Sequence, residues 1–302
     1  MQHEPLFTRR EFLGALSALS VSTGVGAEAE PEPIIDIHQH TNYSGRTDEQ
    51  LIAHQKALGV TTTVLLPAGK WYGLDAQCGG NDSCENLAAR TSGAFRFFAN
   101  EIPYLAEAKE TITSFLKRGA VGIGEQKFRV LSDSRHLANL AAIAAEFNVP
   151  ILLHFWDGDY NMEFARFYKT LEKFPKVNFI GHAQSFWGNI DANYTVADLY
   201  PKGPVKPGGV TDKYLRDFPN MFADLSAGSG LNAIIRDEEH YRGFMERHAD
   251  KLMFGSDCND VIGRGPGCQG AQILAAIRRV APTKQIERKL LFENAKRVLR
   301  IS

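Results

Sequence analysis

The chain has 302 residues, of which 44% are hydrophobic, so it can bury one large α/β core or two ordinary ones. Its 34 basic and 35 acidic residues give a formal net charge of -1, which argues against nucleic acid or an anionic membrane surface as the partner. The sequence contains no internal repeat and no apolar run long enough to span a bilayer. A small, polar or weakly charged substrate is therefore the default expectation.

Residues 1–27 have the order of an export signal. Arg9 and Arg10 are followed by Phe12 and Leu13, then by a run of small and mildly apolar residues, and then by an abrupt change to EAEPEP. A basic region, an apolar region and a small-residue cleavage site in this order are typical of a signal peptide. The arginine pair followed by Phe-Leu resembles the twin-arginine signal. We expect cleavage near Ala27, a linker over 28–32, contact with the twin-arginine export machinery, and a periplasmic or secreted protein with no stable membrane anchor after cleavage.

From residue 33 onward, short apolar runs alternate with amphipathic stretches. The apolar runs predict strands over 33–40, 60–67, 93–102, 120–128, 149–155, 176–183, 220–228 and 251–257. A plausible helical stretch follows each run, which favours an α/β protein built as a single-domain (β/α)8 TIM barrel over residues 33–302. A doubly wound sheet is the alternative. The last helix, over 283–300, is expected to pack on the outside of the barrel.

An irregular insertion rich in Pro, Gly, Asn and Lys covers residues 186–219, between the sixth and seventh predicted strands. A connection this long inside a compact domain is usually functional or disordered. In a barrel it would rise from the C-terminal face, where it can cover the active site.

The four cysteines form two pairs that are close in sequence. Cys78 and Cys84 bracket the turn sequence CGGNDSC, whose ends can meet in a disulfide in an oxidising compartment. Cys258 and Cys268 flank a glycine-rich loop and either bridge or remain free thiols. The spacing of the first pair is too wide for a typical zinc knuckle, and no second pair of zinc type is present.

Ionisable side chains recur at the ends of the predicted strands. His38 and His40 close the first strand and, being two residues apart, point to the same side. Four further strands end in Glu125, His154, His182 and Asp257. Burying such groups unpaired is costly, and a metal centre at the mouth of the barrel would compensate all of them. Nitrogen and oxygen ligands of this kind suit Zn²⁺ or a similar divalent metal, with one or two ions per chain.

At these residues the chain resembles the amidohydrolase superfamily, and within it the amidohydrolase-related (family 2) branch of metal-dependent TIM-barrel hydrolases. The resemblance runs from about residue 33 to the end of the chain. The matching segments are DIHQH, GIGEQKF, ILLHF, FIGHA, DLSAGSG, MFGSD and ENAKRVL.

The resemblance implies a role for each strand-end residue. His38, His40 and Asp257 would hold a first metal, His154 and His182 a second, and Glu125 would bridge the two. Many relatives use a carboxylated lysine as the bridge, so Lys127, on the same face as Glu125, is the rival candidate. Decarboxylases and some hydrolases of this branch hold a single ion, in which case His182 would polarise the substrate instead.

This chemistry predicts a metal-dependent hydrolase. A metal lowers the pKa of bound water toward neutrality, and Asp257 is the predicted catalytic residue that accepts the proton of the attacking water and returns it to the leaving group. The expected target is a C–N or C–O bond in an amide, a lactone or a related ester. A nonoxidative decarboxylase on the same barrel is the nearest alternative. A non-catalytic metal-binding protein of the cell envelope is an alternative from another class, and a TatD-type nuclease is disfavoured because no basic stripe is present.

Substrate contacts are predicted around the mouth of the barrel, where aromatic side chains supply apolar walls and lysines bind anions. The candidates are Lys127, Trp156, Gln184, Trp187 and Lys206. The remaining histidines in the helical stretches, which are His54, His136, His240 and His248, are expected on the surface. Asp36 is expected to orient His38 or to cap the barrel floor. The sequence is compatible with a homo-oligomer.

Overall fold

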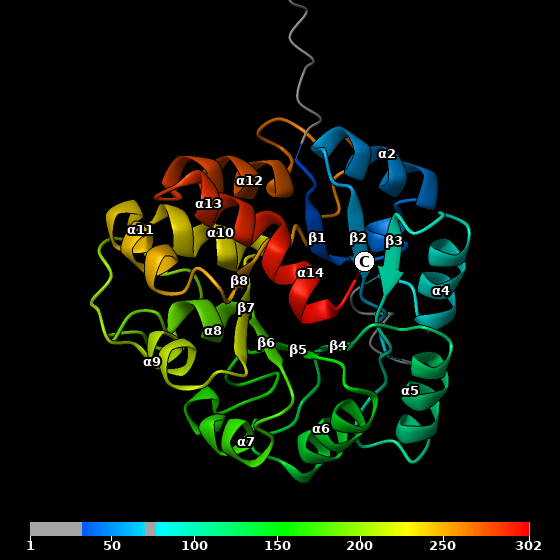
Figure 1. Ribbon diagram of the computed structural model, residues 1–302. Coiled ribbons are helices and arrows are strands. Elements are labelled where there is room, and N and C mark those ends of the chain that lie inside the picture. The colour runs from blue at the N-terminus through cyan, green and yellow to red at the C-terminus, as the bar shows by residue number, and fades with distance from the viewer. Residues whose placement is uncertain (1–31, 70–76, 302) are drawn as a thin grey trace, which may run out of the picture. The chain divides into compact units, whose positions relative to one another are not determined.

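The computed structural model describes residues 32–69 and 77–301 (Figure 1). A compact unit spans Pro33–Ser302. The predicted export signal and its cleavage site lie outside the described residues. Within the described residues, no helix has the length and apolar character needed to cross a membrane.

Among the described residues, eight short strands, all paired in parallel, form the centre of this unit. They are β1 (Ile35–Gln39), β2 (Thr62–Leu65), β3 (Phe95–Phe97), β4 (Ile123–Gln126), β5 (Ile151–His154), β6 (Phe179–His182), β7 (Met221–Asp224) and β8 (Leu252–Met253). Strands β1 to β3 pair in order, and so do β4 to β8. A parallel bridge between Ala99 and Ile123 joins the two sets on one side. On the other side, the backbone N–H of Ile37 donates to the Phe254 oxygen at 3.1 Å.

The strands therefore close into a ring, which Figure 1 shows along its axis. The prediction of an α/β fold with parallel strands is confirmed, and the doubly wound alternative is wrong because an open sheet would leave β1 and β8 unpaired with each other.

Helices surround the ring. The main ones are α2 (Asp48–Leu58), α4 (Asn81–Ala89), α5 (Ala108–Lys117), α6 (Arg135–Phe147), α7 (Tyr168–Lys173), α8 (Gln184–Gly188), α9 (Val210–Asp217), α10 (Ala227–Ile235), α11 (Glu238–Arg247) and α12 (Gln269–Val280). Parallel strands covered by helices are buried on both faces, which explains why they read as nearly continuous apolar runs.

The apolar side chains divide into two clusters. The larger one packs the strands against the surrounding helices. The smaller one fills the interior of the barrel with residues from most of the strands, including Ile37, Val64, Leu152, Ile180 and Phe222. The interior is thus a packed core rather than a pore.

The C-terminal segment closes one end of the barrel. It consists of α13 (Lys284–Arg288), a π-helical segment (Lys289–Glu293) and α14 (Asn294–Leu299). Val298 and Leu299 of α14 belong to the same cluster as the interior side chains, and Figure 1 shows α14 lying across the ring. The expectation that the terminal helix packs on the outside is therefore wrong for α14, which covers the barrel floor.

Helix α2 has well-defined ends. The Thr47 side chain accepts a hydrogen bond from the Gln50 backbone, and the Gln50 side chain accepts one from the Thr47 backbone, which makes a complete capping box. The helix stops at Gly59, whose φ of 81° is a left-handed conformation that glycine adopts without steric cost. These caps fix the helix that follows the first histidine pair.

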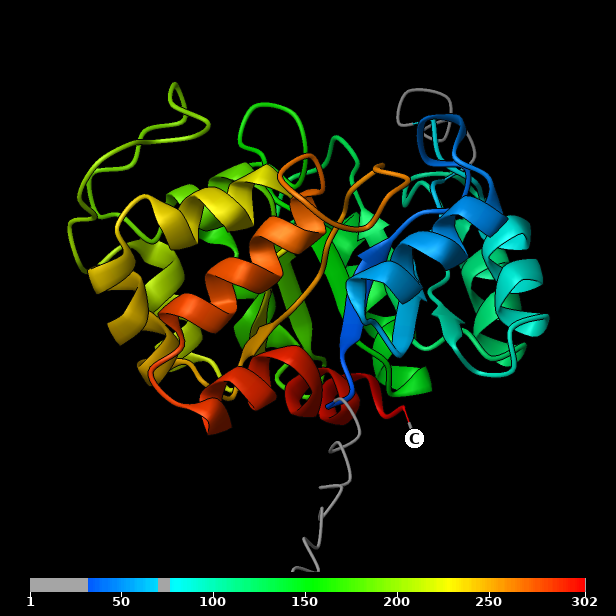
Figure 2. The same cartoon turned by 90° about the horizontal axis from the view of Figure 1, so that it is seen from above.

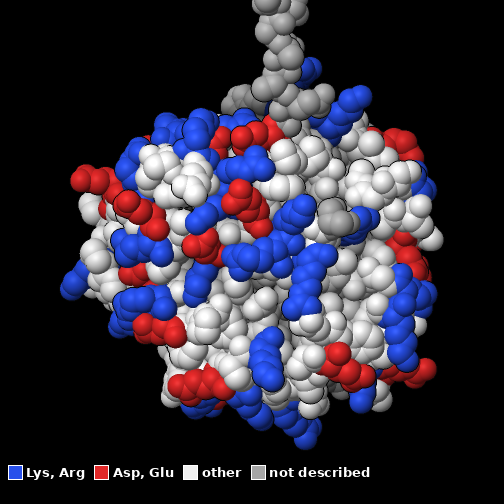
Figure 3. Space-filling model, in the orientation of Figure 1, with Lys and Arg blue, Asp and Glu red and all other residues white. Residues whose placement is uncertain are grey.

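The long connection between β6 and β7 contains α8 and α9, and residues 189–209 between them form no helix or strand. A buried ion pair anchors it, with Arg236 Nη2 2.7 Å from Asp191 Oδ2. Figure 2 shows this loop projecting on the side opposite to α14, as predicted for a connection that rises from the C-terminal face of the barrel. On the face that carries α14, basic and acidic side chains are interspersed (Figure 3), consistent with the net charge near zero.

Replacing Leu152 by alanine will leave a cavity in the barrel interior, because this side chain is fully buried between neighbouring strands. The free energy of unfolding should fall by about 2–5 kcal/mol. Urea titration measures this loss. The control is Ile262→Ala, in a side chain that is 57% exposed, and it should change stability by no more than about 0.5 kcal/mol. Equal effects of the two variants would contradict the packed interior.

Candidate metal centre

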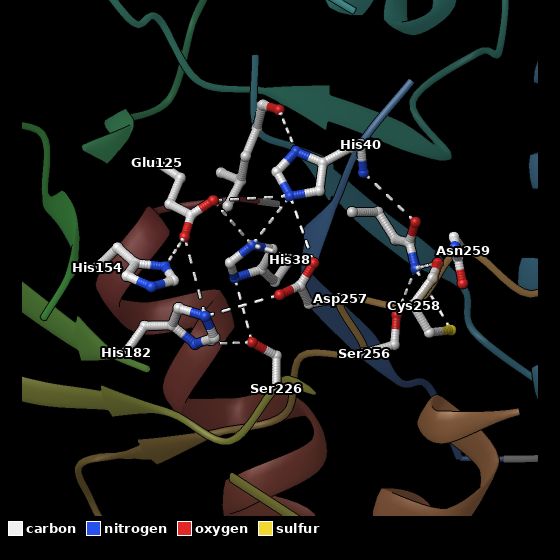
Figure 4. Close-up of polar contacts among 12 residues, drawn as sticks. His38, His40, Glu125, His154, His182, Ser226, Ser256, Asp257, Cys258 and Asn259 are labelled. Carbon is white, nitrogen blue, oxygen red and sulfur yellow. Dashed lines mark hydrogen bonds and ion pairs between the residues drawn. The ribbon is translucent and has the colours of Figure 1, made fainter. Parts of the chain in front are cut away.

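The structure brings together all six ionisable residues predicted at strand ends (Figure 4). His38 lies in β1 and His40 follows it, Glu125 lies in β4, and His154 and His182 end β5 and β6. Asp257 lies in the segment after β8. Five of the six are buried, and the Asp257 side chain is 12% exposed. The cluster therefore sits at the C-terminal end of the barrel, where barrel enzymes carry their active sites.

Strand geometry aims these side chains. His154 and His182 are direct partners in the parallel β5–β6 ladder. Each lies two residues after an interior side chain, Leu152 or Ile180, so strand alternation turns it into the mouth. The ladders of β1 and β4 shift register just before Gln39 and Gln126, and irregularities of this kind re-aim side chains next to active sites.

His38 and His40 face each other through their Nε2 atoms, which are 3.2 Å apart. The Nδ1 of His38 lies 2.6 Å from Asp224 Oδ2, and the Nδ1 of His40 lies 2.7 Å from the Leu66 carbonyl oxygen. Because both acceptors require a proton on Nδ1, each neutral ring presents a lone pair at Nε2. Two opposed lone pairs at this distance need a proton or a metal ion between them, so one ring is protonated when no metal is bound.

Two carboxylate oxygens complete a four-atom set around the histidine pair. Glu125 Oε2 is 3.6 Å from His38 Nε2 and 3.7 Å from His40 Nε2. Asp257 Oδ1 is 3.7 Å and 3.4 Å from the same two nitrogens. A tetrahedral zinc ion with ligands at about 2.0–2.1 Å has ligand–ligand edges of about 3.4 Å. The ligand atoms of His38, His40 and Asp257 all lie within 4.8 Å of one another, so these three residues can share one divalent transition-metal ion, with Glu125 beside them.

The second oxygen of each carboxylate faces the other histidines. His182 Nε2 lies 3.9 Å from Glu125 Oε1 and 3.6 Å from Asp257 Oδ2. His154 Nδ1 lies 2.5 Å from Glu125 Oε1. Glu125 and Asp257 thus stand between the His38–His40 pair and the His154–His182 pair (Figure 4).

Charge in the cluster favours a bound cation. Burial opposes ionisation of Glu125, but His154 and His38 hold its pKa well below the usual range. Burial likewise opposes a charge on Asp257, and His38 and His40 lower its pKa. Burial disfavours a charged His40, but Cys78 and Asp257 outweigh it and raise the pKa to about 10, so a proton occupies this ring near pH 7 and a metal ion would displace it. Burial lowers the pKa of His154 to about 4, although Glu125 opposes that shift, so this ring is neutral near pH 7.

Two atoms of the cluster have no hydrogen-bond partner among the described residues. They are His154 Nε2 and Asp257 Oδ1, and both are buried. Orphaned buried polar atoms are costly and often mark a missing ion or ligand. Together with the opposed histidine nitrogens, they show that the residues present fit a metal centre.

Asp224 is a site residue that our sequence analysis missed. Its Oδ2 accepts from the Ser226 hydroxyl at 2.8 Å and lies 3.2 Å from His182 Nδ1, in addition to its contact with His38. Burial opposes its ionisation, but His38 and His182 hold its pKa well below the usual range. It therefore orients one histidine of each pair. The signal was present, since Asp224 ends the seventh apolar run just as the other site residues end theirs.

Close backbone packing places Asp257. Gly255 has no side chain, and a Cβ there would lie 2.4 Å from Asp224 Oδ1 and 2.9 Å from His38 Cβ. The Asp257 N–H donates to the His38 oxygen at 2.9 Å, and the φ of Asp257 is 41°, in the left-handed region. Asp36, expected to orient His38 or cap the floor, accepts from the backbone N–H groups of His38 and Ser256 and so ties β1 to this segment.

The structure places the predicted substrate-contact residues in different environments. Lys127 lines a cavity of about 80 Å³ together with His40, Tyr43, Pro67, Ala68, Cys78, Glu125 and Asp257. Trp156 contacts Tyr160, and Gln184 donates to the Tyr200 hydroxyl at 3.2 Å. Trp187 is 2% exposed and packs against Phe186, so the structure places it in the core rather than at the mouth. Lys206 is exposed on the 189–209 loop.

Several other predictions are corrected. His54 and His248, expected on the surface, are 0% and 4% exposed. His248 Nε2 lies 2.6 Å from Asp212 Oδ1, which compensates its burial. All four cysteines are free thiols, so neither pair forms the disulfide that remained open from sequence. Cys78 lines the cavity at the metal-ligand cluster, which its position in a turn did not indicate.

A closed ring of parallel strands with histidines and carboxylates at its mouth defines a barrel with a candidate metal centre. The chain matches the family model described as Amidohydrolase over residues 35–301, and it therefore belongs to the amidohydrolase family. No curated protein is significantly similar in sequence.

Solved structures share the fold at low sequence identity. An uncharacterized TIM-barrel protein from Bordetella bronchiseptica has a TM-score of 0.61 and 13% identity, covering 89% of this chain and 98% of that one. A probable 2-pyrone-4,6-dicarboxylic acid hydrolase from Acinetobacter baumannii has a TM-score of 0.59 and 15% identity, covering 88% and 99%. 5-Carboxyvanillate decarboxylase from Sphingomonas paucimobilis has a TM-score of 0.55 and 14% identity, covering 86% and 85%. At these identities the similarity shows the fold alone.

Replacing Asp224 by asparagine will remove the charge that orients His38 and His182 while keeping the side-chain shape. We expect metal affinity to fall about 10–100-fold, as is typical when a partner of a ligating histidine is lost. Competition with a chromophoric chelator measures this affinity. Asp191→Asn, which changes a buried aspartate paired with Arg236 instead, is the matched control and should leave metal affinity unchanged. Unaltered affinity in Asp224→Asn would contradict its orienting role.

Proposed function

We propose that the protein is a metal-dependent hydrolase that cleaves a C–N or C–O bond of a small substrate, such as an amide, a lactone or a related ester. The observation that carries this proposal is the division of carboxylate oxygens between two clusters. Glu125 and Asp257 each direct one oxygen at the His38–His40 pair and the other at His182. This arrangement suits two divalent ions, for which zinc is our first candidate.

A divalent ion at this site would lower the pKa of water and polarise a carbonyl group. Asp257 then supplies the proton transfer. Its pKa is lowered by His38 and His40 despite burial, so it is ionised near pH 7, and its Oδ1 lies 3.4 Å from His40 Nε2 at the mouth of the barrel. It accepts a proton from the attacking water and returns it to the leaving group. His154 holds Glu125 in place through its short Nδ1 contact.

The cavity beside the cluster limits the substrate. At about 80 Å³ it accommodates the reacting group, and Lys127 on its wall is suited to bind a carboxylate or a developing oxyanion. A larger cavity of about 770 Å³ shares Ala68 and Cys78 with it and can hold the rest of the molecule. The proposed substrate is therefore small, with an anionic or carbonyl group at the reacting end.

One observation favours nonoxidative decarboxylation as a second candidate. His154 directs Nδ1 to Glu125, which leaves His182 as the histidine that faces the second oxygens of both carboxylates. Without His154 as a ligand, the site would hold a single ion, through His38, His40, Glu125 and Asp257. The structural similarity to 5-carboxyvanillate decarboxylase is compatible with this reading as well as with hydrolysis.

Products formed in ¹⁸O-labelled water will separate the two reactions. The panel should contain simple lactones, esters and amides, 2-pyrone-4,6-dicarboxylic acid and 5-carboxyvanillate. Hydrolysis places the label in the organic product, whereas decarboxylation releases CO₂ and leaves the organic product unlabelled. We expect labelled product, and we expect Asp257→Asn to lower kcat by about 10²–10⁴-fold because a proton-transfer group is lost.

The matched control is Asp159→Asn, the same change in an exposed side chain. It should leave kcat unchanged. Thermal unfolding must show that Asp257→Asn is folded. Elemental analysis adds the ion count: about two ions in the wild type and fewer in Glu125→Gln support the hydrolase, whereas one ion in both together with CO₂ release supports the decarboxylase. Full turnover by Asp257→Asn would overturn the mechanism.

We also propose export by the twin-arginine route to the periplasm or the exterior, supported by the order of regions in residues 1–27, which lie outside the described residues. Because the arginine pair is the recognised element, replacing both Arg9 and Arg10 by lysine should leave unprocessed protein in the cytoplasm. Cell fractionation with an antibody measures this. Unchanged export of the double variant would contradict the proposed route.

A further inference from the structure

A second cluster of metal-ligating side chains lies outside the candidate metal centre. His54 Nε2 is 3.3 Å from Cys258 Sγ and 3.4 Å from Cys268 Sγ. The same nitrogen is 3.7 Å from Asp260 Oδ2. His54 is fully buried, as is Cys268, and Cys258 is nearly so. One imidazole and two thiols thus converge within the core, and the partly exposed Asp260 carboxylate, whose Oδ2 also accepts from the backbone N–H groups of Ile262 and Gly263, lies at the edge of the cluster.

The four residues come from two separate parts of the chain. His54 lies in the middle of α2, whereas the other three lie in the 254–268 segment between β8 and α12. A cluster that joins them ties the helix after the first strand to the loop that carries Asp257. Metal-binding motifs are recognised in a sequence by short spacings between their ligands. This cluster has no such spacing, because His54 lies about two hundred residues from the two thiols.

The distances match a tetrahedral zinc site. Zinc bonds sulfur at about 2.3 Å and nitrogen or oxygen at about 2.0–2.1 Å, which gives nitrogen–sulfur edges of about 3.6 Å and nitrogen–oxygen edges of about 3.4 Å. The observed nitrogen–sulfur separations are 3.3 Å and 3.4 Å, and the nitrogen–oxygen separation is 3.7 Å. His54 Nε2 faces both sulfurs almost equally, as a shared ion requires. Gln55 Nε2, at 3.5 Å from Nδ1, is too distant to fix the ring tautomer.

A neighbouring buried cation is compatible with an anionic centre here. Arg46 is 3% exposed, and its Nη1 donates to the backbone oxygens of Cys258 and Asp260 at 2.9 Å each. Its other hydrogen bonds within the described residues also reach neutral oxygens, those of the Gln39 side chain and the His40 backbone. A buried guanidinium needs a counter-charge. Asp36 and Asp260 act on it as anionic neighbours, and a divalent ion with two thiolates and one carboxylate would keep the single net negative charge that Asp260 supplies alone, so zinc binding is compatible with the buried Arg46.

We propose that His54, Cys258, Cys268 and Asp260 bind a zinc ion that clamps the 254–268 segment to α2. On binding, the two thiols release their protons to solvent and coordinate as thiolates. A site with four protein ligands is closed and structural rather than catalytic. Because Cys258 directly follows Asp257, the clamp also fixes the backbone next to the proposed catalytic carboxylate. This proposal does not depend on the reaction that the barrel performs.

X-ray absorption at the zinc edge of the full-length protein, purified without chelator, tests the clamp. We expect sulfur scatterers at about 2.3 Å in the wild type, because the candidate metal centre itself is built from nitrogen and oxygen ligands. Cys268→Ser should lose the sulfur signal and about one zinc ion per chain. Zinc bound only by nitrogen and oxygen in the wild type would overturn the proposal, whether or not the variant folds.

Two other buried cysteines provide matched controls. Cys84→Ser and Cys78→Ser change thiols outside the cluster and should retain the sulfur signal; Cys78 is included because it lies beside His40. Loss of the signal in Cys78→Ser but not in Cys268→Ser would assign the sulfur to the barrel mouth and overturn the proposal. Thiol titration of the denatured, chelator-treated protein should find four thiols, and finding only two would instead indicate a disulfide.

Discussion

The hydrogen bond between His38 and Asp224 determines the chemistry of the whole mouth of the barrel. By accepting from Nδ1 of His38, Asp224 turns the Nε2 lone pair toward His40, whose own Nδ1 is held by the Leu66 carbonyl. Two lone pairs that face each other are tolerable only around a proton or a metal ion, so this end of the barrel holds positive charge. The ionised Glu125 and Asp257 add negative charge that also favours a bound cation. The apolar interior beneath them keeps out the water that would otherwise stabilise these charges.

Much of this arrangement could be predicted from the pattern of the sequence. Buried parallel strands read as apolar runs, so the eight strands and the polar residue that ends several of them were visible, and alternation correctly turned His38 and His40 to one side. Asp224 ends its run in the same way, and DLSAGSG was among the segments that carry the family resemblance, but no role was predicted for Asp224. Glu125 reaches the mouth through a register shift in β4. Local periodicity predicts neither that shift nor the contact between Glu125 and His154.

Long-range contacts account for the remaining errors. His54 and His248 occupy helices whose polar neighbours suggest a surface, yet each is buried against a group from a distant segment, the thiols after β8 and Asp212 respectively. Trp187 follows a site strand closely, but the short helix α8 turns it into the core, where its indole donates to the Asp224 carbonyl at 2.8 Å. In each case the partner that decides burial lies too far along the chain for a sequence pattern to register.

Because α14 lies across the barrel floor, the two ends of the barrel are not equivalent. Val298 and Leu299 pack with the interior side chains at one end, and the metal-ligand cluster lies at the opposite end, where the loops after the strands lie. Substrate and product therefore share that end of the barrel. Bound product occupies the space that the next substrate needs, so the rate of product release contributes to kcat alongside the bond-breaking step.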